Sequence, residues 1–489
     1  MPKSLKIAQI ASEVAPYSKS GGLGVVARSL PKAIKRLGHD VVVITPFYEK
    51  VINKEQYNLR LIKEGWDIKI DKKNTVKVDV YRGWLMEGLP IYFIGNKQYF
   101  SKKKSLYGSK NENARFYLFD LAALELLKMI NYAPDIIHCH DWHSGLVPEL
   151  LQERYKKDKN FHSTATLYTI HNLMYQLGHD WWSIPSRLRD DGKAPLPLFN
   201  ENSIERINFV KRAILRADLI NAVSENYAVE IMTKDFGEDL HIILKNRQAK
   251  LFGIVNGIDY DVYNPEKDPG IIRNYNYKKI QHKADNKAWL QKFLSLPVRL
   301  ETPVIAMVTR ITEQKGFDLL DKIIEPLLTQ PLQIAILGGG DKKLISSLKK
   351  IQKNYPDQLG IYPKFTSKYE TSFYAGSDML LMPSRFEPCG LGQLISLRYG
   401  SVPIVRATGG LADTVQNFNP KNESGNGFVF NNYSSKELLI AIIRALENYK
   451  HSRAWKNLVI KGMKISNSWE IPAQKYEVLY NKAIKEANE

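Results

Sequence analysis

Short segments of the sequence carry residue types that could bind a charged, hydroxyl-rich ligand. The first is glycine-rich: Lys19 precedes Gly21, Gly22 and Gly24, after an apolar run at residues 7–11. Without Cβ atoms at Gly21 and Gly22 a ligand can approach the backbone closely, and a helix that begins here directs N–H groups toward an anion. Lys19 adds a full positive charge. The spacing is neither GxGxxG nor GxxxxGK, so a tight turn beside an exposed lysine is an equal alternative.

A second segment places two cations five positions apart, at Arg310 and Lys315, after the apolar run at residues 304–308. Arginine offers a planar fork to phosphate oxygens and lysine a compact charge. Together they could neutralise the negative charge that grows on a departing nucleotide. The alternative is a pair of surface cations beside Glu313.

A third region combines an acid with turns. Glu387 could accept hydrogen bonds from sugar hydroxyls, and the Thr408–Gly410 turn could offer backbone N–H groups to a phosphate. Alternatively, Glu387 is a charge at the start of a helix and the glycines only make a turn. Cys389 is better explained as a small packed residue than as a nucleophile.

Three histidines lie within residues 138–143, and His171 follows a later apolar run. A metal site is disfavoured because no HExxH pattern or carboxylate triad completes a first shell of ligands. Asp141 and Trp142 suit a sugar site, where a carboxylate accepts hydroxyl hydrogen bonds and an indole lies along the sugar ring. A packed aromatic residue with a capping aspartate remains an equal alternative.

Most of these segments follow short apolar runs that predict buried strands. The predicted strands are Lys6–Ala11, Val41–Thr45, Ile91–Ile94, Asp135–Cys139, Ala165–Ile170, Leu219–Val223, Val304–Val308, Ile334–Leu337, Met379–Met382 and Val402–Val405. Amphipathic stretches lie between them, and Phe317–Leu328 and Gly390–Tyr399 are predicted helices. This alternation is typical of the α/β class, in which ligands bind outside the carboxyl ends of parallel strands.

A turn-rich stretch at Phe252–Pro265 separates two groups of predicted strands. A polar, basic region follows it and reaches to about Lys292. We therefore expect two doubly wound domains, with a hinge near this stretch and the substrates enclosed in a cleft between the domains.

The composition excludes several classes of protein. With 489 residues, at roughly 150 per domain, and 44% hydrophobic residues, the chain is neither disordered nor fibrous. The two cysteines, Cys139 and Cys389, form no CxxC pair and fit a reducing compartment. The apolar run at residues 7–11 is too short for a signal peptide, and no run approaches the roughly 20 residues of a membrane span. A soluble, cytoplasmic protein is predicted.

The net charge of +19 is spread over short, scattered clusters such as Lys102–Lys104 and Lys342–Lys343. No zinc-finger spacing or stacked-aromatic motif accompanies them, so the sequence predicts solvated surface rather than a nucleic-acid partner. A smaller part of this charge could steer anions toward a cleft.

Together the segments resemble motifs of the bacterial glycogen synthases and plant starch synthases, which are retaining glycosyltransferases of family 5. Lys19–Leu23 looks like the family's Lys-x-Gly-Gly-Leu motif. Other similar segments, in family order, are His140–His143, Thr169–Asn172, Val255–Asp259, Thr312–Gly316, Ser384–Leu391 and Ala407–Thr414. The resemblance covers nearly the whole chain.

This resemblance implies a GT-B fold of two Rossmann-like domains facing across a cleft. Residues 1–255 would form the acceptor domain and residues 256–467 the nucleotide-sugar domain, and residues 468–489 would form a helix that crosses back to the first domain. The implied reaction transfers glucose from ADP-glucose to the non-reducing end of an α-1,4-glucan with retention of configuration. Neither a metal nor another cofactor is implied, because the leaving phosphate would take the acceptor proton.

The resemblance also assigns roles to residues. Arg310 and Lys315 would hold the diphosphate, and Glu387, Asp141 and His171 would contact the donor glucose. The implied donor-binding residues are Lys19, Gly21, Gly22, Asn256, Phe365, Cys389, Gly390, Leu391, Thr408, Gly409 and Gly410.

Three positions and one segment depart from motifs of this family or a related one. Val25 stands where family members commonly have an acidic residue, and Phe365 replaces a tyrosine that stacks on the donor base. The segment Tyr175–Gly178 reads Tyr-Gln-Leu-Gly in place of Tyr-Gln-Gly. Ile395 replaces the second glutamate of a related glycosyltransferase family, which favours family 5.

Three alternatives stay open. The chain could be a catalytically silent homologue that holds glucan or nucleotide, although both Arg310 and Lys315 are retained. It could use UDP-glucose. A nucleic-acid binder rests on the net charge alone and ranks last. The sequence leaves the oligomeric state open.

Overall fold

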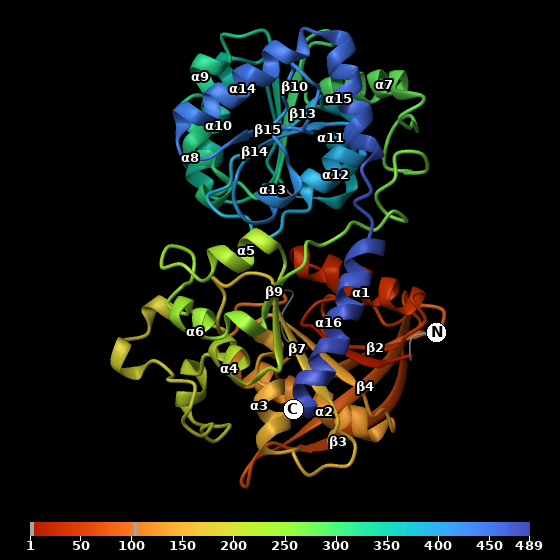
Figure 1. Cartoon of the computed structure of the whole chain (residues 1–489), viewed down its shortest axis with the longest axis vertical. Helices are drawn as coiled ribbons and strands as arrows, with labels where there is room; N and C mark the ends of the chain where they lie inside the picture. Colours follow the sequence, from red (N-terminus) through yellow and green to blue (C-terminus); the bar gives the residue numbers. More distant parts are fainter. Residues whose placement is uncertain (1–3, 102–104, 365) are drawn as a thin grey trace. The chain divides into compact units, whose positions relative to one another are not determined.

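The computed structural model describes residues 4–101, 105–364 and 366–489, which form two α/β units (Figure 1). The first unit contains Met1–Asn256 and Trp469–Glu489, and the second contains Gly257–Ser468. The sequence placed the divisions after residues 255 and 467, whereas the units divide after Asn256 and Ser468. The roles assigned to the two domains remain predictions.

Within the described residues, the first unit is built on a nine-stranded sheet in the order β3-β4-β5-β2-β1-β6-β7-β8-β9. Its strands are β1 Lys6–Ile10, β2 Asp40–Pro46, β3 Arg60–Lys69, β4 Thr75–Met86, β5 Leu89–Gly95, β6 Ile136–His140, β7 Ala165–Ile170, β8 Leu219–Ala222 and β9 Leu251–Gly253. The central strands pair in parallel, and β3 and β4 form an antiparallel hairpin at one edge. Parallel strands are covered on both faces, which is why β6 and β7 are buried along their whole length.

The helices of the first unit are α1 Gly22–Arg36, α2 Glu112–Met129, α3 Val147–Glu153, α4 Phe209–Arg216, α5 Glu225–Glu230, α6 His241–Asn246 and α16 Glu470–Asn488. The C-terminal helix α16 packs on β6, β7 and α1, as Figure 1 shows in dark blue. Its Tyr476 and Tyr480 are fully buried. The last residues of the chain therefore complete the core of the unit that the first residues begin.

The second unit is built on a parallel sheet in the order β12-β11-β10-β13-β14-β15 (Figure 1). Its strands are β10 Val304–Val308, β11 Gln333–Leu337, β12 Leu359–Tyr362, β13 Met379–Met382, β14 Val402–Arg406 and β15 Phe428–Phe430. Its helices are α7 Lys283–Phe293, α8 Phe317–Asp321, α9 Ile324–Leu327, α10 Lys342–Asn354, α11 Ser367–Gly376, α12 Gly392–Arg398, α13 Gly409–Thr414, α14 Ser435–Tyr449 and α15 Ser452–Lys464. Short 3-10 turns complete the chain, among them one at Trp142–Ser144 and one at Glu313–Lys315.

The predicted α/β class is confirmed, and each predicted strand corresponds to an observed one. Five strands were missed: β3, β4, β9, β12 and β15. The single helix predicted over Phe317–Leu328 is wrong, because the segment divides into α8 and α9. Pro326 lacks the N–H that a continuous helix needs at that position. The helix predicted from Gly390 begins at Gly392, since Gly390 has a left-handed φ of 70°.

Among the helices formed by the described residues, none combines the length and the apolar character needed to cross a bilayer.

Candidate functional site

The glycine-rich turn lies between β1 and α1 in the first unit. Gly21 precedes α1 with an extended backbone, and a Cβ atom built on Gly21 or Gly22 would meet no other atom within 4 Å. Both glycines and Lys19 are exposed. Open space therefore lies beside these two glycines, as close approach of a ligand requires, and the surrounding protein does not itself demand glycine there.

Glu13 occupies the inner side of this turn, and the sequence analysis gave it no role. Its Oε2 accepts a hydrogen bond from the Ser20 N–H at 2.6 Å, and its Oε1 accepts one from the Gly24 N–H at 3.0 Å. Burial raises the pKa of Glu13, and the hydrogen bonds from Ser20 and Gly24 oppose that rise. The Gly24 N–H in the first turn of α1 is therefore bonded to Glu13, which corrects for that group the prediction that the helix start directs its N–H groups toward an anion. Its only cue in the sequence is its place between a predicted strand and a glycine-rich segment, which is not specific enough to predict these bonds.

Asp141 and His171 meet because β6 and β7 are parallel neighbours, with His140 in register with Thr169. Asp141 Oδ1 accepts hydrogen bonds from the His171 N–H at 2.7 Å and the Asn172 N–H at 3.2 Å. Asp141 has a left-handed φ of 57°, and burial raises its pKa to about 7. The carboxylate therefore fixes the backbone that follows β7, and both of these bonds use the same oxygen.

The histidines form a buried hydrogen-bonded network. His140 Nδ1 lies 3.0 Å from His171 Nε2, and His138 bonds Tyr480 at 2.9 Å and Thr169 at 2.7 Å. Burial lowers the pKa of His138 and of His140 well below the usual range and that of His171 to about 3. These imidazoles are neutral at physiological pH. No group of three or more His, Cys, Asp or Glu side chains suited to a metal ion occurs in the described part of the chain.

Trp142 is not a sugar platform. It is 4% exposed, stacks on His143 with ring centroids 4.2 Å apart, and meets Phe116 edge-on at 4.9 Å. The packed-aromatic alternative is the correct one for this residue. Its companion, a capping Asp141, is wrong, because the Asp141 side chain makes no cap bond to the turn at Trp142–Ser144.

In the second unit, Lys315 and Glu387 form an ion pair. Lys315 Nζ lies 2.5 Å from Glu387 Oε2, and the Ser384 hydroxyl donates to the same oxygen at 2.9 Å. The Lys315 and Glu387 side chains are 15% and 9% exposed. Arg310 is exposed and donates to Gln314 Oε1 at 3.3 Å. The acid and one of the two predicted cations thus come together in a partly buried position, with the second cation on the same loop.

Glu387 does not start a helix, since α12 begins at Gly392 and Leu391 precedes it. The buried carboxylate faces Lys315 and Ser384 instead.

Three glycines show how closely the loops of the second unit pack. A Cβ atom on Gly316 would lie 2.1 Å from the Pro383 carbonyl oxygen, and one on Gly409 would lie 2.0 Å from the Glu387 carbonyl oxygen. Both have left-handed φ values, of 77° and 45°. A Cβ on Gly410 would lie 2.1 Å from the Cys389 carbonyl oxygen. The loops after β10, β13 and β14 therefore lie against one another at the carboxyl end of the sheet.

The remaining predicted donor-binding residues have mixed surroundings. Cys389 is 6% exposed, as expected of a small packed residue, and Thr408 is buried before α13. The Gly410 N–H donates to the carbonyl oxygens of Glu387 and Pro388, each at 3.2 Å, so this amide is already satisfied by the protein. The prediction that the N–H groups of this turn bind a phosphate is therefore corrected for Gly410.

Asn256 is 5% exposed, and its Oδ1 is buried without a hydrogen-bond partner among the described residues. Phe365 lies outside the described residues.

A small cavity beside the Lys315 loop is lined by Val308, Thr309, Lys315, Leu381, Met382 and Ser384.

Three residues that depart from the motifs are buried in the fold. Val25 is buried in α1, and Ile395 is buried in α12. Leu177, which separates Gln176 from Gly178, is 3% exposed and packs in a small cluster with Trp181 and Ile184. These three side chains therefore contribute to packing.

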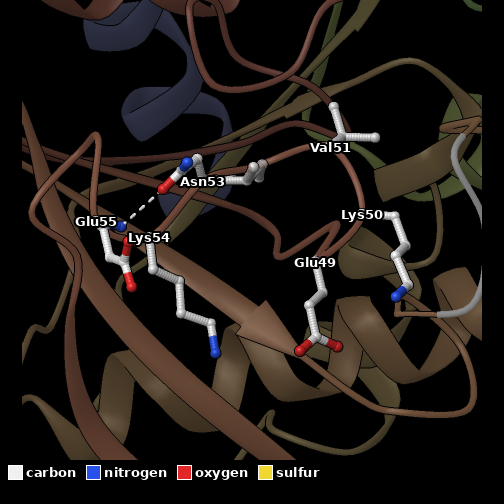
Figure 2. Close-up of a pocket in the computed structure, with 7 residues that line it drawn as sticks. Glu49, Lys50, Val51, Asn53, Lys54 and Glu55 are labelled. Atoms are coloured by element: carbon white, nitrogen blue, oxygen red, sulfur yellow. Dashed lines mark hydrogen bonds between the residues drawn. The ribbon is translucent and has the colours of Figure 1, made fainter.

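A separate surface pocket lies in the first unit. Figure 2 shows that it is lined by one continuous segment, residues 49–55, and that Asn53 Oδ1 accepts a hydrogen bond from the Glu55 N–H. The segment carries two acids, Glu49 and Glu55, and two lysines, Lys50 and Lys54. None of the predicted site residues lines it, so it is not the candidate site.

Comparisons with known proteins show the family of the chain. Residues 6–246 match the model of the starch synthase catalytic domain, and residues 291–461 match the model of glycosyl transferases group 1. The chain is 42% identical to a glycogen synthase of Thermosipho africanus over 488 residues, which are 98% of this chain and 99% of that protein. It is 41% identical to a glycogen synthase of Geotalea daltonii over 484 residues, which are 97% of this chain and 98% of that protein.

Among solved structures, the catalytic domain of starch synthase IV from Arabidopsis thaliana bound to ADP and acarbose matches with a TM-score of 0.87 and 34% identity. The match covers 99% of this chain and 100% of that one. A sucrose-phosphate synthase from Thermosynechococcus elongatus, at 17% identity and a TM-score of 0.62, shares the fold. The predicted GT-B class is confirmed. The chain belongs to the glycogen and starch synthases, a family of glucosyltransferases.

Proposed function

We propose that the protein transfers glucose from ADP-glucose to the non-reducing end of an α-1,4-glucan, with retention of the anomeric configuration. The observation that carries the proposal is the Lys315–Glu387 pair, held at 2.5 Å on loops at the carboxyl end of the second sheet, with Arg310 on the same loop as Lys315. The choice of ADP as the nucleotide is supported by the structure of the Arabidopsis starch synthase IV domain, which was bound to ADP and acarbose.

Lys315 and Arg310 hold the donor diphosphate in this proposal. As the bond between the anomeric carbon and the phosphate oxygen breaks, negative charge grows on the leaving nucleotide, and positioned cations stabilise it more in the transition state than in the bound substrate. Glu387 orients the Lys315 ammonium through their ion pair, and Ser384 orients Glu387. Preorganisation of this kind lowers the reorganisation needed when the charge develops.

Asp141 and His171 contact the donor glucose in the same proposal. Asp141 Oδ1 already holds the backbone after β7, so its other oxygen is the one assigned to a sugar hydroxyl. The glycines at 21 and 22 leave space for the ligand beside an exposed Lys19. The leaving phosphate accepts the acceptor proton, and the reaction uses neither a metal nor a further cofactor.

One assay tests the proposal. The purified protein is incubated with glycogen and either ADP-glucose or UDP-glucose, with EDTA and without added metal, and release of the nucleoside diphosphate and incorporation of glucose are both measured. We expect ADP release that depends on glycogen and survives EDTA, with a lower rate from UDP-glucose. Binding of ADP without detectable transfer would identify a silent homologue instead, and a requirement for added metal would refute the metal-free mechanism.

A further inference from the structure

His140 lies in the interior of the first unit, where it is 0% exposed, and its two ring nitrogens face different partners. His140 Nδ1 is 3.0 Å from His171 Nε2, and His140 Nε2 is 3.4 Å from Gln9 Oε1. The three residues come from the adjacent strands β1 and β6 and from the end of β7. A continuous row of polar side chains thus leads from the middle of the sheet to the loop that carries His171.

The partners determine the order of the hydrogen bonds in this row. A neutral imidazole has one donor nitrogen and one acceptor nitrogen. The Gln9 Oε1 can only accept, so His140 donates from Nε2 and must accept at Nδ1. His171 then donates from Nε2, which leaves its Nδ1 as a hydrogen-bond acceptor.

Burial keeps both histidines neutral, so each ring retains one donor and one acceptor nitrogen and the direction of the hydrogen bonds does not change. It lowers the pKa of His171 to about 3 and that of His140 well below its usual range. The His171 backbone is fixed as well, because its N–H donates to Asp141 Oδ1 at 2.7 Å. The ring and the backbone of His171 are therefore held independently, one by His140 and the other by Asp141.

We propose that His140 is a positioning residue that holds His171 in the neutral tautomer protonated at Nε2, so that His171 Nδ1 accepts a hydrogen bond from the substrate. Gln9 is the anchor of the row, since its acceptor oxygen fixes the direction of both bonds. The inference deepens the proposed function and rests on it only in assigning His171 to the donor glucose. Side chains that orient a functional histidine through its second nitrogen act in the same way at other enzyme sites.

His138 provides a matched control. It lies two residues earlier on the same strand, is equally buried, and contacts His140 with the two rings tilted and their centroids 4.1 Å apart. Its hydrogen bonds go to Tyr480 and Thr169 and not to His171. His138→Phe and His140→Phe therefore make the same chemical change at neighbouring buried positions, and only the second removes the partner of His171.

The kinetic test compares these variants with the wild-type protein by ADP release in the presence of glycogen. We expect His140→Phe to lower kcat on the order of tenfold, the effect of one lost hydrogen bond of about 1.4 kcal/mol, with a smaller change in the KM for ADP-glucose. His138→Phe should lower the melting temperature by a similar amount and keep kcat within about twofold of the wild type. Equal kcat values for the two variants would overturn the inference.

A spectroscopic test does not depend on either variant folding. Nitrogen-15 NMR of the wild-type protein with labelled histidine distinguishes a protonated from an unprotonated ring nitrogen, and His171→Gln identifies the His171 signals. We expect His171 protonated at Nε2 and bare at Nδ1, and a mixture of tautomers in Gln9→Met, which removes the acceptor while both histidines remain. A wild-type His171 protonated at Nδ1 would overturn the inference. If the wild-type protein releases no nucleoside diphosphate, the proposed function fails and this NMR result decides the inference alone.

Discussion

The loops that follow the strands of the two units use opposite electrostatic designs. In the second unit, a charged pair, Lys315 and Glu387, lies 2.5 Å apart near an exposed Arg310. In the first unit, burial holds His140 and His171 neutral and raises the pKa of Asp141 to about 7. The loops after β10 and β13 present full charges, whereas the segments around the ends of β6 and β7 present neutral hydrogen-bonding groups.

This difference matches the two kinds of group in a nucleotide sugar. A diphosphate carries charge that full cations stabilise, whereas a hexose offers hydroxyl groups that neutral donors and acceptors recognise at lower cost of desolvation. We therefore expect the charges of Lys315 and Arg310 in the second unit to govern turnover, and the tautomer and protonation state of groups in the first unit to govern how the sugar is held.

Lys315→Ala should have the largest effect. Removing one preorganised charge at a developing anion lowers kcat on the order of 10²–10³-fold. Steady-state release of ADP measures the loss, and the melting temperature shows whether the fold is retained. Lys349→Ala, at an exposed lysine in α10, is the control for loss of a positive charge and should match the wild-type rate. Equal rates in the Lys315 and Lys349 variants would remove the diphosphate role.

Alanine substitutions of glycine should change the stability of the protein by different amounts in the two sets of loops. Gly409→Ala should destabilise the protein by roughly 1–3 kcal/mol, because Gly409 has a φ of 45° and the new Cβ would lie 2.0 Å from the Glu387 carbonyl oxygen. Gly21→Ala meets nothing within 4 Å and should change the stability by less than about 0.5 kcal/mol. Chemical denaturation of both variants measures the contrast. A Gly21 variant as unstable as the Gly409 variant would show that the open space beside Gly21 is needed by the protein itself.

Glu387→Gln tests whether the charge of the pair, rather than its packing, orients Lys315. The substitution keeps the size of the side chain and removes its charge, so kcat should fall about tenfold, the loss of one charge-assisted hydrogen bond. Ser384→Ala removes a hydrogen bond that an uncharged donor makes to the same oxygen, so it should lower kcat less. If the Ser384 variant were the slower of the two, the ion pair would not be the main device that orients the lysine.

The sequence predicted those parts of the fold and site that depend on local pattern. The runs at Ala165–Ile170 and Val304–Val308 coincide with β7 and β10, because parallel strands buried on both faces are mostly apolar. The edge strand β3 was missed because it is mostly exposed and mixes charged with apolar residues. The break between α8 and α9 was missed as well. The surrounding residues have the apolar spacing of one helix, although Pro326 in α9 has no N–H to continue it.

Prediction of the site from the sequence has the same limit. Motif resemblance indicated Lys315 and Glu387, but their ion pair depends on how the loops after β10 and β13 pack. Glu13 has a partner seven residues away, the Ser20 N–H, yet no spacing rule distinguishes it from any other acid near a turn. The bond between His140 and His171 follows from the pairing of β6 with β7, which the sequence does not specify.

Asp141→Asn gives the smallest and most specific effect, a change in how stability depends on pH. In the folded protein the pKa of Asp141 is about 7, against an ordinary value of 3.8. Between these values the folded state keeps a proton that the unfolded state releases, so rising pH favours unfolding by up to about 1.4 kcal/mol for each pH unit. This contribution is fully present below pH 4 and is lost as the pH rises through 7.

Asparagine does not titrate, and its Oδ1 can still accept from the His171 and Asn172 N–H groups. The melting temperature of Asp141→Asn, measured relative to the wild type, should therefore increase steadily from pH 5 to pH 7 and remain level above about pH 8. Asp191 is a useful control, because its carboxylate is exposed and its pKa is lowered by hydrogen bonds from Ala194 and Lys193. Asp191→Asn should show no such increase over this range. A flat difference for Asp141→Asn would mean that the carboxylate is charged throughout, and the contrast between a charged second unit and a neutral first unit would then rest on the histidines alone.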